Sequence, residues 1–118
     1  MAKQNKTLFD LSGKYTLITG SCGLLGTQHS IALSKINSNL VLVDIDTRKG
    51  LRLKNKLKKN YSNKIYYFSC DITKKNDIDL LRLELKRKKI KINILINNAS
   101  INPQPNDVEK KSDWENSL

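Results

Sequence analysis

Apolar and polar positions divide the chain into two alternating kinds of segment. Short runs rich in apolar and β-branched residues are typical of strands. They cover 14–20, 40–44, 64–69 and 91–96, and the second is apolar enough to be buried on both faces. Longer segments with apolar residues near a 3.6-residue period are typical of helices, and they cover 24–36, 47–60 and 75–89. The pattern predicts the order β-α-β-α-β-α-β.

The first predicted helix has an apolar stripe made of Leu25, Ala32 and Ile36, widened by Leu24 and Ile31. We expect this stripe to face the sheet. In the other two helices the predicted buried positions are Leu53, Leu57 and Tyr61, followed by Ile78, Leu81 and Leu85.

Two threonines are the predicted caps of the second and third helices, because a hydroxyl can accept from a free first-turn N–H group. They are Thr47 and Thr73. Gly50 should weaken the first turn of the second helix. The final stretch holds both prolines and predicts a loop, then a helix starting at about Ser112. Alternation with short connections predicts right-handed βαβ units and a parallel sheet.

A glycine-rich loop, Thr19-Gly-Ser-Cys-Gly-Leu-Leu-Gly26, joins the first strand to the first helix. Gly20 permits a sharp turn, Gly23 allows backbone amides to approach a pyrophosphate, and Gly26 allows close packing of the helix. Free N–H groups at the helix start favour phosphate. The alternative is a tight turn with packing glycines and no ligand. The predicted cofactor-binding residues in this loop are Gly20, Ser21, Gly23, Leu24 and Leu25.

Asp44 closes the second strand, 18 residues after Gly26. A carboxylate there can accept from both hydroxyls of an adenosine ribose and repels a 2′-phosphate. Ile45 follows it and the glycine loop has no Arg, so NAD is favoured over NADP. Arg48 and Lys49, one turn further on, keep NADP open. The alternative role for Asp44 is that of a helix-capping acid.

Together these segments resemble the N-terminal half of a short-chain dehydrogenase/reductase. Four features match that family in order: residues 11–14 before the first strand, the glycine loop, Asp71-Ile72-Thr73 after the third strand, and Asn97-Asn98-Ala99-Ser100 after the fourth. The resemblance covers about residues 9–118. It implies one partial NAD(P)-binding Rossmann domain over 1–118, an α/β parallel sheet with helices on both faces, truncated after the fourth strand.

The family's roles carry over to matching positions. Asp71 resembles the acid that accepts from the adenine amino group, and the Ile72 amide would meet the adenine ring. Asn97 resembles the residue that braces the central sheet. Three residues would pass their backbone beside the cofactor riboses: Asn98, Ala99 and Ser100.

Two departures from the family pattern stand out. The main-line family has glycines at the positions of Leu24 and Gly26, whereas here they are Gly23 and Gly26, a spacing that resembles the extended, sugar-nucleotide-modifying branch. Ser100 replaces the usual Gly, which costs on the order of 1 kcal/mol if that position needs positive φ.

The family's proton transfer needs a Tyr with a Lys four residues later, together with a Ser and an Asn. Four residues after the tyrosines come Thr19, Ile65, Cys70 and Asp71, so no such pair occurs and no catalytic residue is expected. Trp114 resembles the Trp that opens the next long helix. We expect an NAD(P)-binding fragment, inactive alone, of an oxidoreductase that moves hydride between nicotinamide and an alcohol or carbonyl substrate. The alternative is a non-catalytic dinucleotide-binding module.

Charge and cysteine content narrow the function classes. The net charge is +11, but the excess is mostly Lys on predicted surfaces, with no aromatic stacking platform, so we expect no nucleic-acid role. No apolar stretch reaches the roughly 18–20 residues of a membrane span, and the start shows no secretory signal. Two cysteines form no disulfide framework or metal cluster, so a cytoplasmic setting is expected. The parent enzyme is expected to be a homo-oligomer.

Three single residues have both a chemical and a structural interpretation. A helix start favours a thiolate at Cys22, although a small loop residue is the preferred interpretation. Cys70 is expected in the core, and His29 is expected on the surface of the first helix or partly packed against its neighbours.

Overall fold

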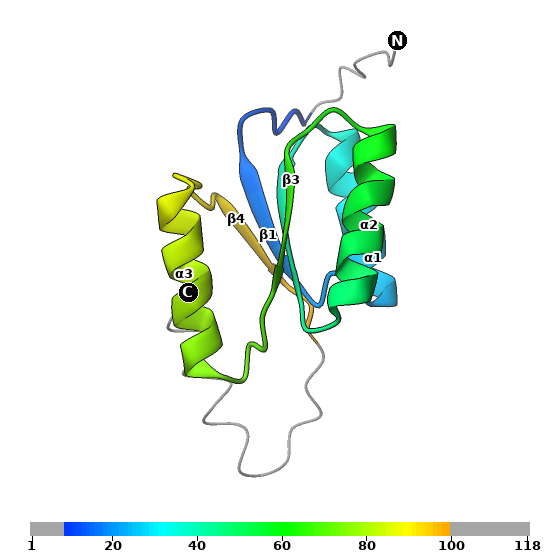
Figure 1. Cartoon of the computed structure of the whole chain (residues 1–118). Helices are drawn as coiled ribbons and strands as arrows, with labels where there is room; N and C mark the ends of the chain where they lie inside the picture. Colours follow the sequence, from blue (N-terminus) through cyan, green and yellow to red (C-terminus); the bar gives the residue numbers. More distant parts are fainter. Residues whose placement is uncertain (1–8, 100–118) are drawn as a thin grey trace.

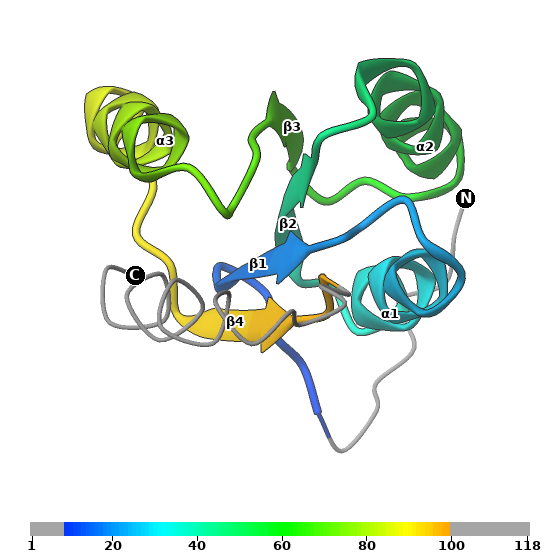
Figure 2. The ribbon, with the colours of Figure 1, turned by 90° about the horizontal axis from the view of Figure 1, so that it is seen from below.

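A computed structural model describes residues 9–99 and shows a parallel four-stranded sheet. The strand order is β3-β2-β1-β4, with β1 at Tyr15–Thr19, β2 at Asn39–Asp44, β3 at Ile65–Ser69 and β4 at Ile94–Asn97. Three helices alternate with the strands: α1 (Leu24–Lys35), α2 (Thr47–Asn60) and α3 (Lys75–Arg87) (Figure 1). Viewed along the sheet, α1 and α2 cover one face and α3 the other (Figure 2). The predicted Rossmann-type α/β order is confirmed.

Two apolar clusters lie on opposite faces of the sheet, because side chains alternate along each strand. From β2, Val41 and Val43 pack with the buried residues of α3, and Leu40 and Leu42 pack with those of α2. All four are fully buried, as predicted for this strand. The helix positions that meet them are those expected from the periodicity: Leu53 and Leu57 in α2, and Ile78, Leu81 and Leu85 in α3.

The predicted apolar stripe of α1 is wrong for most of its members, although Ile31 is partly buried against the apolar cluster on the α2 side of the sheet. Three of its members are exposed: Leu24 (82%), Leu25 (62%) and Ala32. The buried face instead carries small residues one turn apart, namely Gly26, Ser30 and Ser34. The Ser30 hydroxyl donates to the Gly26 carbonyl at 2.7 Å, so its polar group is satisfied within the helix. Small side chains let α1 approach the sheet closely, which a search for large apolar residues does not detect.

Gly26 makes the closest approach in this packing. A Cβ at this position would overlap the Gly20 carbonyl oxygen and lie 2.8 Å from the Ser21 Cα. Both neighbours are backbone atoms at the end of β1, so neither can rotate away. The predicted close-packing role of Gly26 is confirmed, and its contact is the turn that follows the strand.

The predicted caps of α2 and α3 are also wrong by one residue. Asp46 caps α2, since its side chain accepts from the Lys49 N–H at 3.1 Å, and Thr47 is the first helical residue. Lys74 occupies the cap position of α3 without a side-chain hydrogen bond, and the Thr73 hydroxyl turns back to Asp71. An Asp side chain one residue earlier reaches the first turn better than the expected Thr.

The fourth strand is shorter than predicted, starting at Ile94 instead of residue 91. Asn93 comes just before it and makes two hydrogen bonds with the backbone of Tyr15. Its N–H donates to the Tyr15 carbonyl and its side-chain oxygen accepts from the Tyr15 N–H, each at 2.9 Å. The helix expected near Ser112 lies outside the described residues. Within 9–99, none of the three helices combines the length and apolarity needed to cross a bilayer.

Asp46→Ala should destabilise the fold by about 1 kcal/mol, because the first turn of α2 loses the side-chain acceptor of its cap. Thr47→Ala is the matched control and should change the free energy of unfolding by less than half of that. Urea melts of the two variants and the parent measure the difference. Equal losses would mean that the cap is not at Asp46.

Gly26→Ala should cost about 3 kcal/mol, since its methyl group meets rigid backbone. Gly23→Ala is the control: its Cβ would be 3.4 Å from the Gly20 oxygen, so a loss of about 1 kcal/mol or less is expected. Urea midpoints distinguish them, and a Gly26→Ala protein as stable as Gly23→Ala contradicts the close packing of α1.

Candidate functional site

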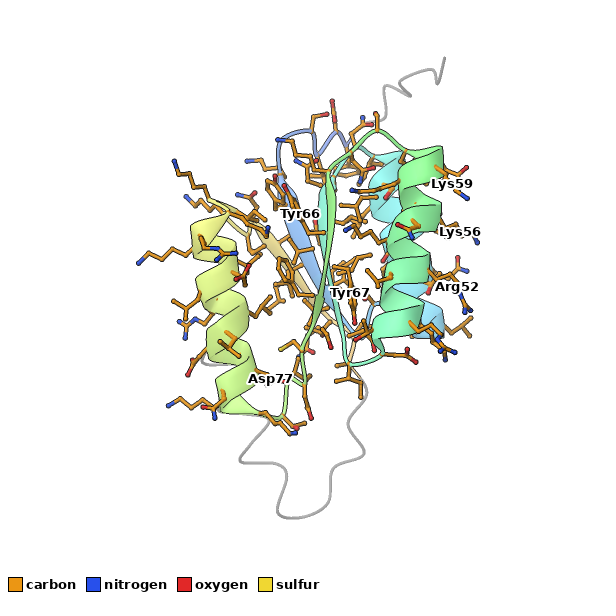
Figure 3. The ribbon with its side chains drawn as sticks, in the orientation of Figure 1. Arg52, Lys56, Lys59, Tyr66, Tyr67 and Asp77 are labelled. Atoms are coloured by element: carbon orange, nitrogen blue, oxygen red, sulfur yellow. The ribbon has the colours of Figure 1, made fainter. Side chains whose placement is uncertain are left out.

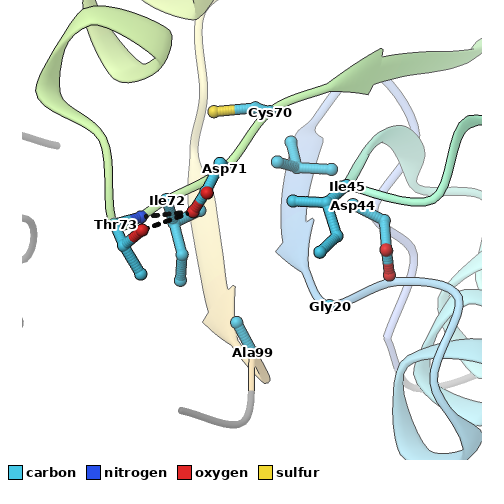
Figure 4. A pocket seen from close by; sticks show the side chains of 9 residues that line it. Gly20, Asp44, Ile45, Cys70, Asp71, Ile72, Thr73 and Ala99 are labelled. Carbon is cyan, nitrogen blue, oxygen red and sulfur yellow. Dashed lines mark hydrogen bonds between the residues drawn. The ribbon is translucent and has the colours of Figure 1, made fainter.

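A pocket of about 260 Å³ opens at the carboxyl ends of the strands (Figure 4). In parallel α/β sheets this edge is where ligands bind. Five predicted site residues line the pocket: Gly20, Asp44, Asp71, Ile72 and Ala99. Its other lining residues are Val43, Ile45, Cys70 and Thr73. Residues from four separate segments of the chain therefore meet at the edge of the sheet where the sequence motifs predict a cofactor site.

Gly20 forms the turn out of β1 with a φ of +62°, which L side chains rarely adopt. A Cβ there would lie 2.8 Å from the Ala99 Cα, so the turn also requires close contact with the end of β4. The Asn98 side-chain amide donates to the Gly20 carbonyl at 3.3 Å. The predicted sharp turn at Gly20 is confirmed, and its neighbour is the segment after β4.

A buried hydroxyl ties this segment to β1. Thr19 donates to the Asn97 side-chain oxygen at 3.1 Å and accepts from the N–H groups of Asn98 and Ala99, at 3.0 and 3.2 Å. Thr19 is fully buried. Asn97 thus contacts β1 as its resemblance implied. Sequence reasoning missed the role of Thr19, whose only signal is a polar β-branched residue directly before the glycine turn.

Asp44 is the last residue of β2, and both of its carboxylate oxygens accept from backbone. Oδ2 accepts from the Cys22 N–H and Oδ1 from the Asp46 N–H, each at 3.0 Å. The side chain therefore connects the end of β2 to the glycine loop. The capping alternative is not supported, because Asp46 caps α2. A carboxylate has about four acceptor positions, so Asp44 can still accept from a ligand.

The predicted loop residues divide into two groups. Ser21 is fully buried, and its hydroxyl donates to the Val43 carbonyl at 3.3 Å, so its side chain holds the loop to β2 and does not line the pocket. Gly23 caps α1 with no side-chain bond, and the first turn has no acidic residue. Within residues 9–99 the N–H groups of Leu24 and Leu25 find no acceptor. This end of α1 is accordingly positive and open to an anion.

Asp71 lies in a tight turn after β3. Its Oδ1 accepts from the N–H and the hydroxyl of Thr73, at 3.0 and 2.6 Å (Figure 4). These bonds, first of all that of the hydroxyl, lower the pKa of Asp71 below its usual value. The N–H of Asp71 donates to Asp77 at 2.9 Å. The turn therefore presents an ionised carboxylate beside the half-buried Ile72.

The reactive side chains considered singly are the two cysteines and the histidine, and each of the three is at least partly buried. Burial raises the pKa of Cys22 to about 11, with Asp44 nearby acting in the same direction, so the thiolate favoured by the helix start does not form at neutral pH. Cys70 is buried in the core as expected, and its pKa is also raised to about 11. His29 is half-buried on α1. Ser100 lies outside the described residues, among which no cluster of His, Cys, Asp or Glu could hold a metal.

Cys22 should react slowly with iodoacetamide at pH 7, because only the thiolate attacks and burial disfavours it. The rate should rise with pH up to about 11, the folded pKa. Cys70→Ser isolates the Cys22 signal in mass spectrometry, and a free-cysteine peptide is the reference. A folded protein whose Cys22 outpaces the peptide at pH 7 would show an activated thiol instead.

Comparisons with known proteins agree with this architecture. A short-chain dehydrogenase/reductase of Gibberella zeae is 38% identical over 91 residues, which are 77% of this chain and 33% of that protein. The chain thus spans about a third of the length of this curated relative. A structure of L-sorbose reductase from Gluconobacter frateurii with NADPH and L-sorbose matches with a TM-score of 0.80 at 18% identity, covering 93% of this chain and 48% of the other.

A second solved structure shares the same fold. It is a putative D-mannonate oxidoreductase from Haemophilus influenza with bound NAD, with a TM-score of 0.73 at 21% identity, covering 80% of this chain and 34% of that one. The family model for short chain dehydrogenases matches residues 14–118, nearly the whole sequence. Fold, motifs and family match coincide, and the chain belongs to the short-chain dehydrogenase/reductase family of oxidoreductases.

Proposed function

We propose that residues 1–118 form one partial domain that binds a nicotinamide dinucleotide, NAD in preference to NADP. The observation that carries the proposal is the pocket in which the Gly20 turn, the Asp44 carboxylate and the Asp71 turn meet. Gly20 supports the proposal because its tight turn brings the end of β1 to the pocket, and a side chain there would collide with Ala99. The chemistry of the groups also fits, with free N–H groups at the start of α1 for the phosphates and two carboxylates, Asp44 and Asp71, lining the pocket.

Each part of the cofactor has a candidate partner. The pyrophosphate would lie at the start of α1, against the free N–H groups of Leu24 and Leu25, which end the loop that also holds Gly20, Ser21 and Gly23. Asp44 would accept from the hydroxyls of the adenosine ribose. The Asp71 carboxylate and the Ile72 amide would meet the adenine. The backbone of Asn98, Ala99 and Ser100 would run beside the riboses.

The preference for NAD follows from charge. A 2′-phosphate would be placed against the Asp44 carboxylate, whose Oδ1 accepts from the backbone N–H of Asp46. Arg48 and Lys49 are exposed on the first turn of α2 and are the groups that could oppose this repulsion. Ile45 is 68% exposed beside Asp44 and offers no charge to a phosphate. The Asp44 carboxylate at the proposed ribose position favours the unphosphorylated cofactor.

The reaction we propose for the whole protein is hydride transfer between the nicotinamide ring and an alcohol or carbonyl carbon, as in oxidoreductases of this family. The bound cofactor supplies the hydride chemistry. No Tyr in the 118 residues has a Lys four positions later, so these residues are assigned binding and orientation of the cofactor and no proton transfer. Binding of the substrate is assigned to the part of the protein that provides the catalytic acid and base.

NADH should bind at least tenfold more tightly than NADPH, because Asp44 accepts from the free ribose hydroxyls and repels the 2′-phosphate. Asp44→Asn should narrow the ratio to less than about threefold. Fluorescence titration with both cofactors measures the ratio of the two dissociation constants. Asp79→Asn on α3 is the control for the change in net charge and should leave the ratio as it is. Equal parental affinities, or a preference for NADPH, would refute the role given to Asp44.

A further inference from the structure

We infer that Tyr67 is a positioning residue for the Asp44 carboxylate, and that Gly50 exists in α2 to make room for it. The inference rests on the proposed function, in which Asp44 binds the adenosine ribose. Tyr67 lies on β3 and is not one of the residues that line the pocket. Its effect on a ligand would therefore pass through Asp44.

Tyr67 reaches the end of the neighbouring strand with its hydroxyl. The phenol donates to the Asp44 main-chain carbonyl at 2.7 Å, and the same carbonyl accepts from the Cys70 N–H at 3.2 Å. Burial raises the pKa of Tyr67, which keeps the hydroxyl protonated and able to donate. The ring points to the α2 side of the sheet, whereas that of Tyr66 points to the α3 side (Figure 3).

Gly50 provides the space that this ring occupies. A Cβ on Gly50 would overlap the ring, and even its Cδ1 would be only 2.5 Å away. Gly50 is buried inside the first turns of α2, where glycine costs about 1 kcal/mol relative to alanine. The packing of the Tyr67 ring gives a physical reason for a glycine that the helical pattern alone marks as a weakness.

The anchored carbonyl matters because Asp44 is the last residue of β2. The next residue, Ile45, is exposed and outside the sheet. The carboxylate is held by the Cys22 and Asp46 N–H groups, and the backbone that carries it is held by Tyr67 and Cys70. Removal of the Tyr67 hydroxyl leaves the Cys70 N–H as the one remaining donor to the Asp44 carbonyl among the described residues. The carboxylate then samples more orientations, and a ligand must order it on binding.

Tyr67→Phe removes this one hydroxyl and keeps the ring in the Gly50 space. We expect it to weaken ADP binding about threefold to tenfold, the range of a single hydrogen bond. Binding of 2′-deoxy-ADP, which lacks a hydroxyl for Asp44, should change less than twofold. Calorimetric titration of both probes against the parent and the variant measures this coupling. Tyr66→Phe, on the same strand but the opposite face, is the matched control and should leave both affinities unchanged.

A second variant tests the Gly50 space without removing the phenol. Gly50→Ala should displace the ring and reproduce the selective loss of ADP binding, and adding Tyr67→Phe to it should cost nothing further. A parent protein that binds both probes equally overturns the ribose role of Asp44, and the inference with it. A parent that prefers ADP while Tyr67→Phe keeps the same preference, or loses both probes equally, overturns the inference alone.

Discussion

The steric constraint on which the site depends is the absence of side chains at the turn after β1. Gly20 lets the end of β1 touch the backbone of Ala99, and Gly26 lets α1 touch the backbone of that same turn. The turn after β1, the start of α1 and the segment after β4 therefore meet main chain to main chain. The start of α1, with its unpaired N–H groups, is fixed as a result against the turn at Gly20, which lines the pocket together with Asp44 and Asp71.

The order and type of the elements could be predicted because strong local patterns carry them. Val41 and Leu42 belong to an uninterrupted apolar run, and Ile78 and Leu81 repeat at helical spacing, so burial on both faces of a strand or on one face of a helix is evident without a structure. The pocket residues could be located for a related reason. Each predicted pocket residue ends or follows a predicted parallel strand, and the carboxyl ends of such strands share one edge.

What could not be predicted depends on contacts between distant residues. The buried face of α1 consists of residues such as Ser30, whose small size matters only because the sheet is close. The role of Gly50 depends on a ring from β3, and the role of Thr19 depends on residues 78 to 80 positions away. The predicted cap of α2 is wrong by one residue. Asp46 and Thr47 both have suitable side chains, and only the path of the chain into the helix decides between them.

Thr19 has a hydroxyl with one donor and two acceptor positions, and all three are engaged at the ends of β1 and β4. Valine has the same shape but would leave two N–H groups and an amide oxygen without this partner, whereas serine keeps the same chemistry. The two strand ends are consequently cross-linked through one side chain, and the Asn98 amide adds a further bond to the Gly20 carbonyl. Any force on the backbone at Gly20 would therefore be passed to residues 98 and 99, so the floor of the pocket behaves as a joint of two strands and not as the tip of one.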